Sequence, residues 1–178
     1  TSWVNPNEAY DRAVESFVRQ VLVVEDSDGF LNDFNQFHQK LAFAGMLNSL
    51  AQTLFKMTAP GVPDFYQGTE LWDLSLVDPD NRRPVDFAKR RSLLEDLKRR
   101  ESVDRAGLLG DLLSRWQDGR VKLYLVYKAL RFRRGHCELF QTGDYLPLYA
   151  GGKFRENVCA FARRLTDHWI IIAAPRLL

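Results

Sequence analysis

Cysteine is scarce in this sequence, and long apolar runs are absent. Cys137 and Cys159 are the two cysteines among 178 residues, and no CxxC spacing relates them. A zinc site or a disulfide framework is therefore not expected, and we interpret both side chains as reduced thiols. No run approaches the roughly 18 apolar residues that cross a bilayer, and no charged and then apolar leader opens the chain. We therefore predict a cytoplasmic protein with no membrane partner.

The sequence also lacks an excess of charge of one sign. Its 25 lysines and arginines oppose 23 aspartates and glutamates, which leaves a net charge of +2. Such a balance gives no electrostatic reason to expect a nucleic-acid partner. His38, His136 and His168 share no metal-ligand spacing, so we predict no metal and no cofactor. The charge balance does not exclude a neutral polar ligand.

Apolar side chains, by contrast, are abundant and make up 46% of the sequence. This content and the length of the chain are sufficient for a folded domain with a core. The first residue, Thr1, is not a methionine, and an apolar run from Trp169 to Pro175 nearly closes the chain. We therefore expect a piece of a longer protein.

Two long helical patterns open the chain. Asn5 and Glu8 have the spacing of a capping box, which predicts a helix from residue 6 to about residue 24. Residues 26–29 should break that helix, and the same periodicity predicts a second helix over residues 31–57. The first helix has an apolar stripe that we expect to face a core, formed by Tyr10, Val14, Phe17, Val18, Val21 and Leu22.

In the middle of the chain, turns and loops alternate with a short strand and a helix. A turn at residues 58–61 should end the second helix, and residues 62–66 read as a short strand. A long polar loop over residues 69–84 follows, rich in residues that favour turns. Residues 85–100 predict a surface helix with basic residues outward and four apolar residues inward, namely Phe87, Leu93, Leu94 and Leu97.

The last third of the chain changes from helix to strand. Residues 108–116 and 121–134 predict two more helices, although tyrosine and valine leave strand as the alternative for the second. Beyond Gly135, short apolar runs between turn residues are typical of an antiparallel sheet. These runs span residues 145–150, 158–162 and 169–174. We predict an α+β fold, with a mostly helical domain over residues 1–134 and a β domain over residues 135–178.

One long motif carries a resemblance to a known family. Residues 58–72 read TAPGVPDFYQGTELW and residues 76–86 read LVDPDNRRPVD, and together they resemble the maltooligosyl trehalose synthases of the α-amylase superfamily. Shorter stretches in the same order extend the likeness over nearly the whole chain. The resemblance implies that residues 1–134 are the tail of a catalytic (β/α)8 barrel, with residues 62–66 as its eighth strand. Residues 135–178 would then begin an antiparallel β domain.

The resemblance also implies a reaction and a substrate. The family converts the reducing-end α-1,4 linkage of a maltooligosaccharide into an α,α-1,1 linkage by intramolecular transfer, which makes the parent protein an isomerase. Retaining chemistry of this kind needs carboxylates. In this superfamily they lie on the fourth, fifth and seventh barrel strands, which we expect before Thr1. The resemblance therefore implies no catalytic residue in this chain, and an isolated chain without activity.

Binding candidates follow the predicted strand, because the end of a barrel strand and its following loop face the active site. An aromatic ring can stack on a sugar, and forked polar groups suit vicinal hydroxyls. The alternatives are a core position for the aromatic ring and a self-satisfied turn network for the polar residues. Asp64 is expected to be structural. We predict that substrate is bound by Tyr66, Gln67, Glu70, Asp80, Asn81 and Arg82.

Two other functions remain open at this stage. One is another α-glucan hydrolase or transferase of the same superfamily, with a different product. The other is a non-catalytic sugar-binding module. For the chain by itself, we expect apolar helix faces that meet solvent, with self-association or marginal stability as the result.

Overall fold

The computed structural model describes residues 2, 4–23 and 28–177. The chain divides into two compact units, Thr1–Gly45 and Met46–Leu178. Helix α2, Asp28–Thr58, begins in the first unit and continues into the second. None of the described helices combines the length and the apolar content that a bilayer-spanning segment requires.

Helix α1 spans Glu8–Leu22, close to the prediction. Its N-cap is Asn7, whose side chain accepts a hydrogen bond from the backbone N of Tyr10 at 3.1 Å. The predicted capping box led by Asn5 is therefore wrong by two positions. The predicted end near residue 24 lies outside the described residues, and Gly29, expected in the break, already belongs to α2.

The apolar stripe of α1 lies in solvent. No residue of this helix is buried, and Phe17 is 65% exposed. Within its own unit, Thr1–Gly45, no described residue buries the stripe, so this unit does not supply the core that the sequence predicts. The expected exposure of apolar helix faces, however, is confirmed.

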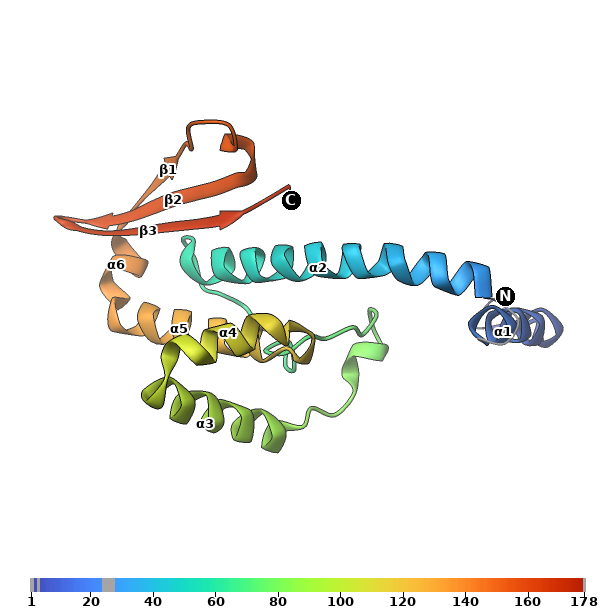
Figure 1. Cartoon of the computed structure of the whole chain (residues 1–178). Helices are drawn as coiled ribbons and strands as arrows, with labels where there is room; N and C mark the ends of the chain where they lie inside the picture. The colour runs from blue at the N-terminus through green and yellow to red at the C-terminus, as the bar shows by residue number, and fades with distance from the viewer. Residues whose placement is uncertain (1, 3, 24–27, 178) are drawn as a thin grey trace. The chain divides into compact units, whose positions relative to one another are not determined.

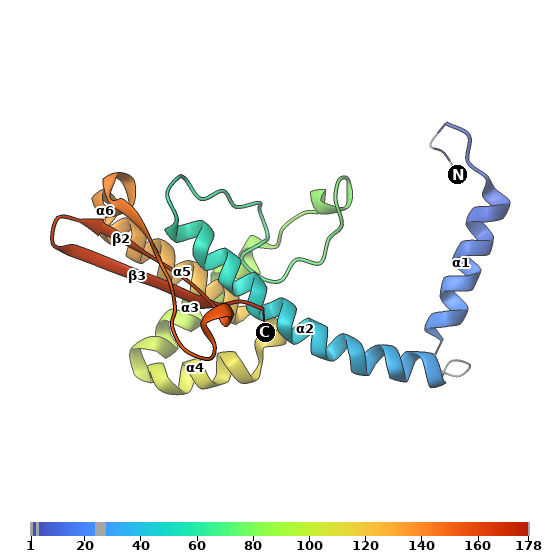
Figure 2. The ribbon, with the colours of Figure 1, turned by 90° about the horizontal axis from the view of Figure 1, so that it is seen from above.

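Three helices of the second unit pack around one core. They are α3 (Phe87–Val103), α4 (Arg105–Ser114) and α5 (Arg120–Gly135), which lie side by side in Figure 1 and Figure 2. Helix is therefore confirmed for α5, and the strand alternative is wrong. Buried side chains from the loop and from these helices form the core: Leu71, Leu97, Leu108, Leu112, Leu123 and Tyr124.

Phe87 of α3, predicted to face the core, is exposed to solvent instead. Asp86 is the N-cap of this helix, and its side chain accepts from the backbone N of Lys89 at 2.8 Å. Phe87 is therefore the first residue of the helix, where its ring extends past the core, and it is 58% exposed. Leu97, in contrast, is fully buried as predicted.

The chain ends in a three-stranded antiparallel sheet of order β1-β2-β3, drawn in orange and red in Figure 1. The strands are β1 (Asp144–Leu148), β2 (Val158–Leu165) and β3 (His168–Pro175), which confirms the predicted runs. Phe161, at the middle of β2, is opposite Pro147 on one side and Ile172 on the other. The short helix α6, Cys137–Thr142, precedes the sheet and was not predicted. Cys137 and Cys159 are both free thiols.

Residues 62–66 do not form the predicted strand. A strand exists only through ladder hydrogen bonds to a neighbour, and the described strands pair only with one another. The predicted turn before this segment is present, since α2 ends at Thr58. Arg133 of α5 fixes it by donating to the backbone oxygens of Met57, at 2.8 Å, and Gly61, at 2.5 Å. The barrel assignment stays a prediction.

Candidate functional site

The loop that follows Tyr66 and the start of α3 line an open pocket of about 430 Å³. We call it the loop pocket. Gly68 enters it with φ +94°, and a Cβ at that position would lie 3.2 Å from Val85 Cγ2, so glycine suits this turn. The polar and aromatic groups that line the pocket include Gln67, Trp72, Ser75, Asn81, Arg83 and Arg90.

Glu70 anchors the loop rather than lining this pocket. Its Oε2 accepts from Arg90 Nε at 3.1 Å, and Arg90 Nη2 donates to the backbone oxygen of Gly68 at 2.8 Å. The two side chains are 28% and 19% exposed, so this pair is partly shielded from water. The contact explains why an acidic residue stands here, and a role for Glu70 in binding stays a prediction.

Asp80 belongs to a hydrogen-bonded turn. Its Oδ2 accepts from the backbone N of Leu76 at 2.7 Å, while Arg83 Nε donates to the Asp80 backbone oxygen at 3.1 Å. Arg83 Nη2 also donates to Ser75 Oγ at 2.9 Å. The turn is continued by the 3-10 helix η1, Asp80–Arg82. These contacts match the self-satisfied network that the sequence offered as an alternative to sugar binding.

Arg82 has its own partner within the loop. Its Nη2 donates to Asp78 Oδ2 at 2.7 Å, and both side chains are more than half exposed. A surface pair of this kind contributes about 0–1 kcal/mol, so it leaves the guanidinium free to exchange partners. Binding by Arg82 stays a prediction.

Asn81 differs from its neighbours in the turn. Its Oδ1 is buried and has no hydrogen-bond partner among the described residues. A buried acceptor left unpaired costs about 1–3 kcal/mol. Since Asn81 lines the loop pocket, a donor from a bound molecule, such as a sugar hydroxyl, is the kind of group that would satisfy it.

Trp72 holds the loop against the helices. Its Nε1 donates to the backbone oxygen of Trp116 at 2.6 Å, at the start of the 3-10 helix η2, Trp116–Asp118. Gly119, with φ +79°, lies so close that a Cβ there would be 3.0 Å from the Trp72 backbone N. Trp72 therefore anchors the loop while its ring lines the loop pocket.

Tyr66 lines a different pocket. This second pocket, of about 410 Å³, lies among the end of α2, residues 64–69 and the start of α5, and we call it the lysine pocket. Its lining includes Ser49, Gln52, Lys56, Asp64, Tyr66 and Lys122. The six predicted residues are thus not one cluster, since Gln67 and Asn81 line the loop pocket and Tyr66 lines the lysine pocket. Sequence reasoning missed Lys56 and Lys122, because only the tertiary fold brings these helices together.

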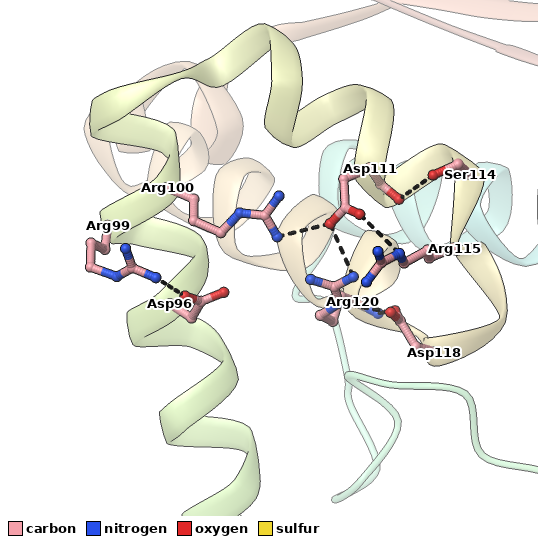
Figure 3. A network of polar contacts seen from close by, with 8 residues as sticks. All are labelled: Asp96, Arg99, Arg100, Asp111, Ser114, Arg115, Asp118 and Arg120. Atoms are coloured by element: carbon pink, nitrogen blue, oxygen red, sulfur yellow. Dashed lines mark hydrogen bonds and ion pairs between the residues drawn. The ribbon is translucent and has the colours of Figure 1, made fainter.

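A third polar cluster joins α3, α4 and α5 around Asp111 (Figure 3). Asp111 Oδ2 accepts from Arg100 Nη1 at 2.8 Å and from Arg120 Nη2 at 3.1 Å, and Oδ1 pairs with Arg115 Nε at 3.1 Å. The Arg100 hydrogen bond is the largest cause of a lowered pKa of Asp111, and the charges of Arg115 and Arg120 add to it. Arg100, predicted to point outward, instead bridges two helices. This cluster stabilises the fold.

The chain was compared with known proteins by sequence and by structure. No family model matches the chain. A curated protein of Mycobacterium tuberculosis named as a maltooligosyl trehalose synthase is 37% identical over 179 residues, which cover 99% of this chain and 19% of the relative.

In the part of the chain that the structure describes, no group of three or more histidine, cysteine, aspartate or glutamate side chains is placed to hold a metal ion.

Solved structures give the same result. The maltooligosyltrehalose synthase of Arthrobacter ramosus matches with a TM-score of 0.75 and 36% identity, over 99% of this chain and 21% of that one. A hypothetical maltooligosyl trehalose synthase of Sulfolobus tokodaii matches with a TM-score of 0.68 and 31% identity, over 92% of this chain and 20% of that one. The chain therefore spans about a fifth of the length of the proteins it matches.

Proposed function

Because this chain corresponds to one segment of the maltooligosyl trehalose synthases, we propose that it is part of an enzyme that rearranges α-glucans. The parent enzyme converts the reducing-end α-1,4 linkage of a maltooligosaccharide into an α,α-1,1 linkage by intramolecular transfer. The observation that carries this proposal is the match itself, which runs at 37% identity over 99% of the chain. A shared loop or a short motif alone would not extend over helices and sheet together.

Within the parent enzyme, we assign residues 1–134 to the end of the catalytic barrel and residues 135–178 to the start of a β domain. The order of elements supports this division, since helices precede an antiparallel sheet. The unpaired segment 62–66 follows α2 and precedes a polar loop, which is the sequence of elements around a barrel strand. The proposed location of the enzyme is the cytoplasm.

The contribution of this chain to catalysis is to bind substrate through the loop pocket. Asn81 Oδ1 is a buried acceptor that a sugar hydroxyl can satisfy, and Gln67 lines the same pocket with an amide that donates and accepts. Asp80 and Arg82 hold the turn that presents Asn81, through Leu76 and Asp78, and we propose that they bind substrate from outside the pocket lining. Glu70 keeps this loop against α3 through Arg90, and Tyr66 reaches the substrate from the neighbouring lysine pocket.

The chain alone is proposed to be inactive. Glycosyl transfer with retention needs a carboxylate nucleophile and a second carboxylic acid on opposite sides of the scissile bond. In the superfamily these groups belong to barrel strands other than the one assigned to residues 62–66. Binding without turnover is therefore the expected behaviour of the isolated chain.

The test uses the parent enzyme with maltopentaose. A product with a non-reducing trehalose end supports the proposal, whereas free glucose or maltose would assign the chain to another α-glucan hydrolase or transferase. Binding of maltopentaose with no product from the parent enzyme would identify a sugar-binding module instead.

The site is tested separately with Asn81→Leu. This change removes the unpaired acceptor Oδ1. We expect kcat/KM to fall about tenfold, which corresponds to roughly 1.4 kcal/mol of transition-state binding. Gln117→Leu, at an exposed position of η2 outside the loop pocket, is the matched control and should leave kcat/KM unchanged. Equal values for both variants would exclude Asn81 from the substrate site.

A further inference from the structure

Two cations, Lys56 and Lys122, line the lysine pocket together with one carboxylate, Asp64. Lys56 Nζ lies 4.0 Å from the centroid of the Phe65 ring, and Lys122 Nζ lies 5.5 Å from that of Trp72. An aromatic face attracts an ammonium group within about 6 Å and so fixes its position, but it carries no net charge. Among the described residues, neither lysine has an acidic group within ion-pair distance, whereas Lys128 pairs with Glu101.

The two ammonium groups also repel each other. Burial is the largest cause of a lowered pKa of Lys122, and the charge of Lys56 is the next, while Asp73 and Glu70 act in the opposite direction. Two like charges line this pocket, one on the half-buried Lys122 and one on the exposed Lys56, and their repulsion raises the free energy of the empty pocket. A bound anion relieves this repulsion and also replaces the water that Lys122 loses on burial.

The remaining lining suits hydroxyl groups. Gln52 offers an amide that donates and accepts, Ser49 offers a hydroxyl, and Asp64 offers acceptors only. A simple inorganic anion would leave Asp64 facing negative charge, whereas a ligand with an anionic end and a hydroxylated end can use both kinds of group. Tyr66 adds an aromatic surface, of the kind on which an apolar sugar face packs.

We propose that the lysine pocket binds a sugar phosphate, with the phosphate between Lys56 and Lys122 and the sugar hydroxyls against Asp64 and Gln52. The volume of about 410 Å³ lies within the range of about 300–1,000 Å³ of pockets that hold small molecules. The proposal does not depend on the reaction of the parent enzyme, because it assigns a ligand and no chemical step. It adds an anionic ligand to a chain whose proposed substrate is neutral.

The test is calorimetric titration of the 178-residue chain with glucose 6-phosphate, inorganic phosphate and glucose. We expect glucose 6-phosphate to bind at least tenfold more tightly than glucose, with inorganic phosphate between them. Equal affinity for glucose and glucose 6-phosphate, or no binding of glucose 6-phosphate, would overturn the proposal without any variant.

Variants locate the binding site. Lys56→Met and Lys122→Met should each weaken glucose 6-phosphate about tenfold and leave the weak binding of glucose unchanged, since each removes one charge-assisted contact. Lys153→Met is the matched control, because Lys153 also stands over a ring, 5.3 Å from that of Phe154, but lies outside the lysine pocket. If all three variants bind glucose 6-phosphate as the unmodified chain does, the lysine pocket is not its site.

Discussion

Arg163 of β2 donates from Nη1 to the backbone oxygen of Thr58, the last residue of α2, at 3.4 Å. Arg163 is 1% exposed, and its guanidinium also donates to the backbone oxygens of Phe140 at 3.0 Å, Gly143 at 2.8 Å and Asp144 at 3.2 Å. Burial is the main cause of a lowered pKa of Arg163, and the charge of Arg133 adds to it. One buried cation therefore satisfies carbonyl groups of a helix end, of α6 and of the first strand.

Replacing Arg163 by methionine should destabilise the chain by about 2–4 kcal/mol, because several buried carbonyl groups lose their donor together. Urea unfolding followed by far-UV circular dichroism measures the change. Arg164→Met is the matched control, since its partner Asp144 is 58% exposed and such a surface pair contributes about 0–1 kcal/mol. Similar losses for both variants would show that the carbonyl contacts of Arg163 contribute little.

Gly119→Ala should destabilise the second unit by about 1–2 kcal/mol. The backbone has φ +79° there, and the new Cβ would lie 3.0 Å from the backbone N of Trp72, so both strain and a close contact oppose alanine. Gly110→Ala provides the opposite case, because Gly110 lies within α4 with nothing near its missing Cβ. That change should stabilise by about 0.5–1 kcal/mol through helix propensity, and differential scanning calorimetry can measure both effects.

Acid should weaken the contact between α3 and α5 at Glu101. Its Oε1 accepts from Lys128 Nζ at 2.6 Å and from Tyr124 OH at 2.7 Å, and these bonds, that from Lys128 first, hold the pKa of Glu101 below its ordinary 4.5. A carboxyl whose pKa is lowered by folding stabilises the fold above its unfolded pKa. That stabilisation is lost as the pH falls from 4.5 through the folded pKa.

The variant Glu101→Gln separates this contribution from general acid unfolding. Glutamine cannot gain a proton in this pH range as the Glu101 carboxylate does, so the urea midpoint of the variant should fall less steeply below pH 4.5 than that of the unmodified chain. Glu95→Gln, on the exposed side of α3, should leave the pH profile unchanged. Parallel profiles for Glu101→Gln and the unmodified chain would contradict the assignment.

Asp111→Asn should lower the Tm of the second unit, because three arginines then share no common counter-charge (Figure 3). We expect a fall of about 3 °C or more at low salt, and a smaller fall at high salt, where screening weakens the lost attraction. Asp96→Asn breaks the pair with Arg99 on the surface of α3 and should have almost no effect. A salt-independent difference would mean that Asp111 acts by packing rather than by charge.

Local signals were enough to predict most elements of the fold. The turn at residues 58–61 ended α2 as expected, and turn residues separated the three strands correctly. Helix α6 escaped prediction because six residues are too few to show a period. The strand predicted at residues 62–66 is absent from the described part of this chain, because strand formation depends on a partner and no described strand pairs with this segment.

The candidate site also has a part that local sequence signals predict and a part that depends on tertiary packing. The turn network could be predicted, as the alternative to sugar binding, because Asp80 and Arg82 pair with their own neighbours in the sequence. The lysine pocket could not, since Lys56 and Lys122 belong to separate helices that only tertiary packing brings together. Arg100 was assigned to solvent because its spacing on α3 fits an exposed face, and its partner Asp111 belongs to another helix.

The position of Trp72 gives this protein an optical reporter of its own. The indole lines the loop pocket, donates to Trp116, and has Lys122 of the lysine pocket above its ring. Indole fluorescence depends on such hydrogen bonds and on nearby charge, so detachment of the loop should shift the emission to longer wavelength. Since the chain has four tryptophans, a variant that keeps Trp72 alone would allow ligands that enter either cavity to be followed by fluorescence, without a label.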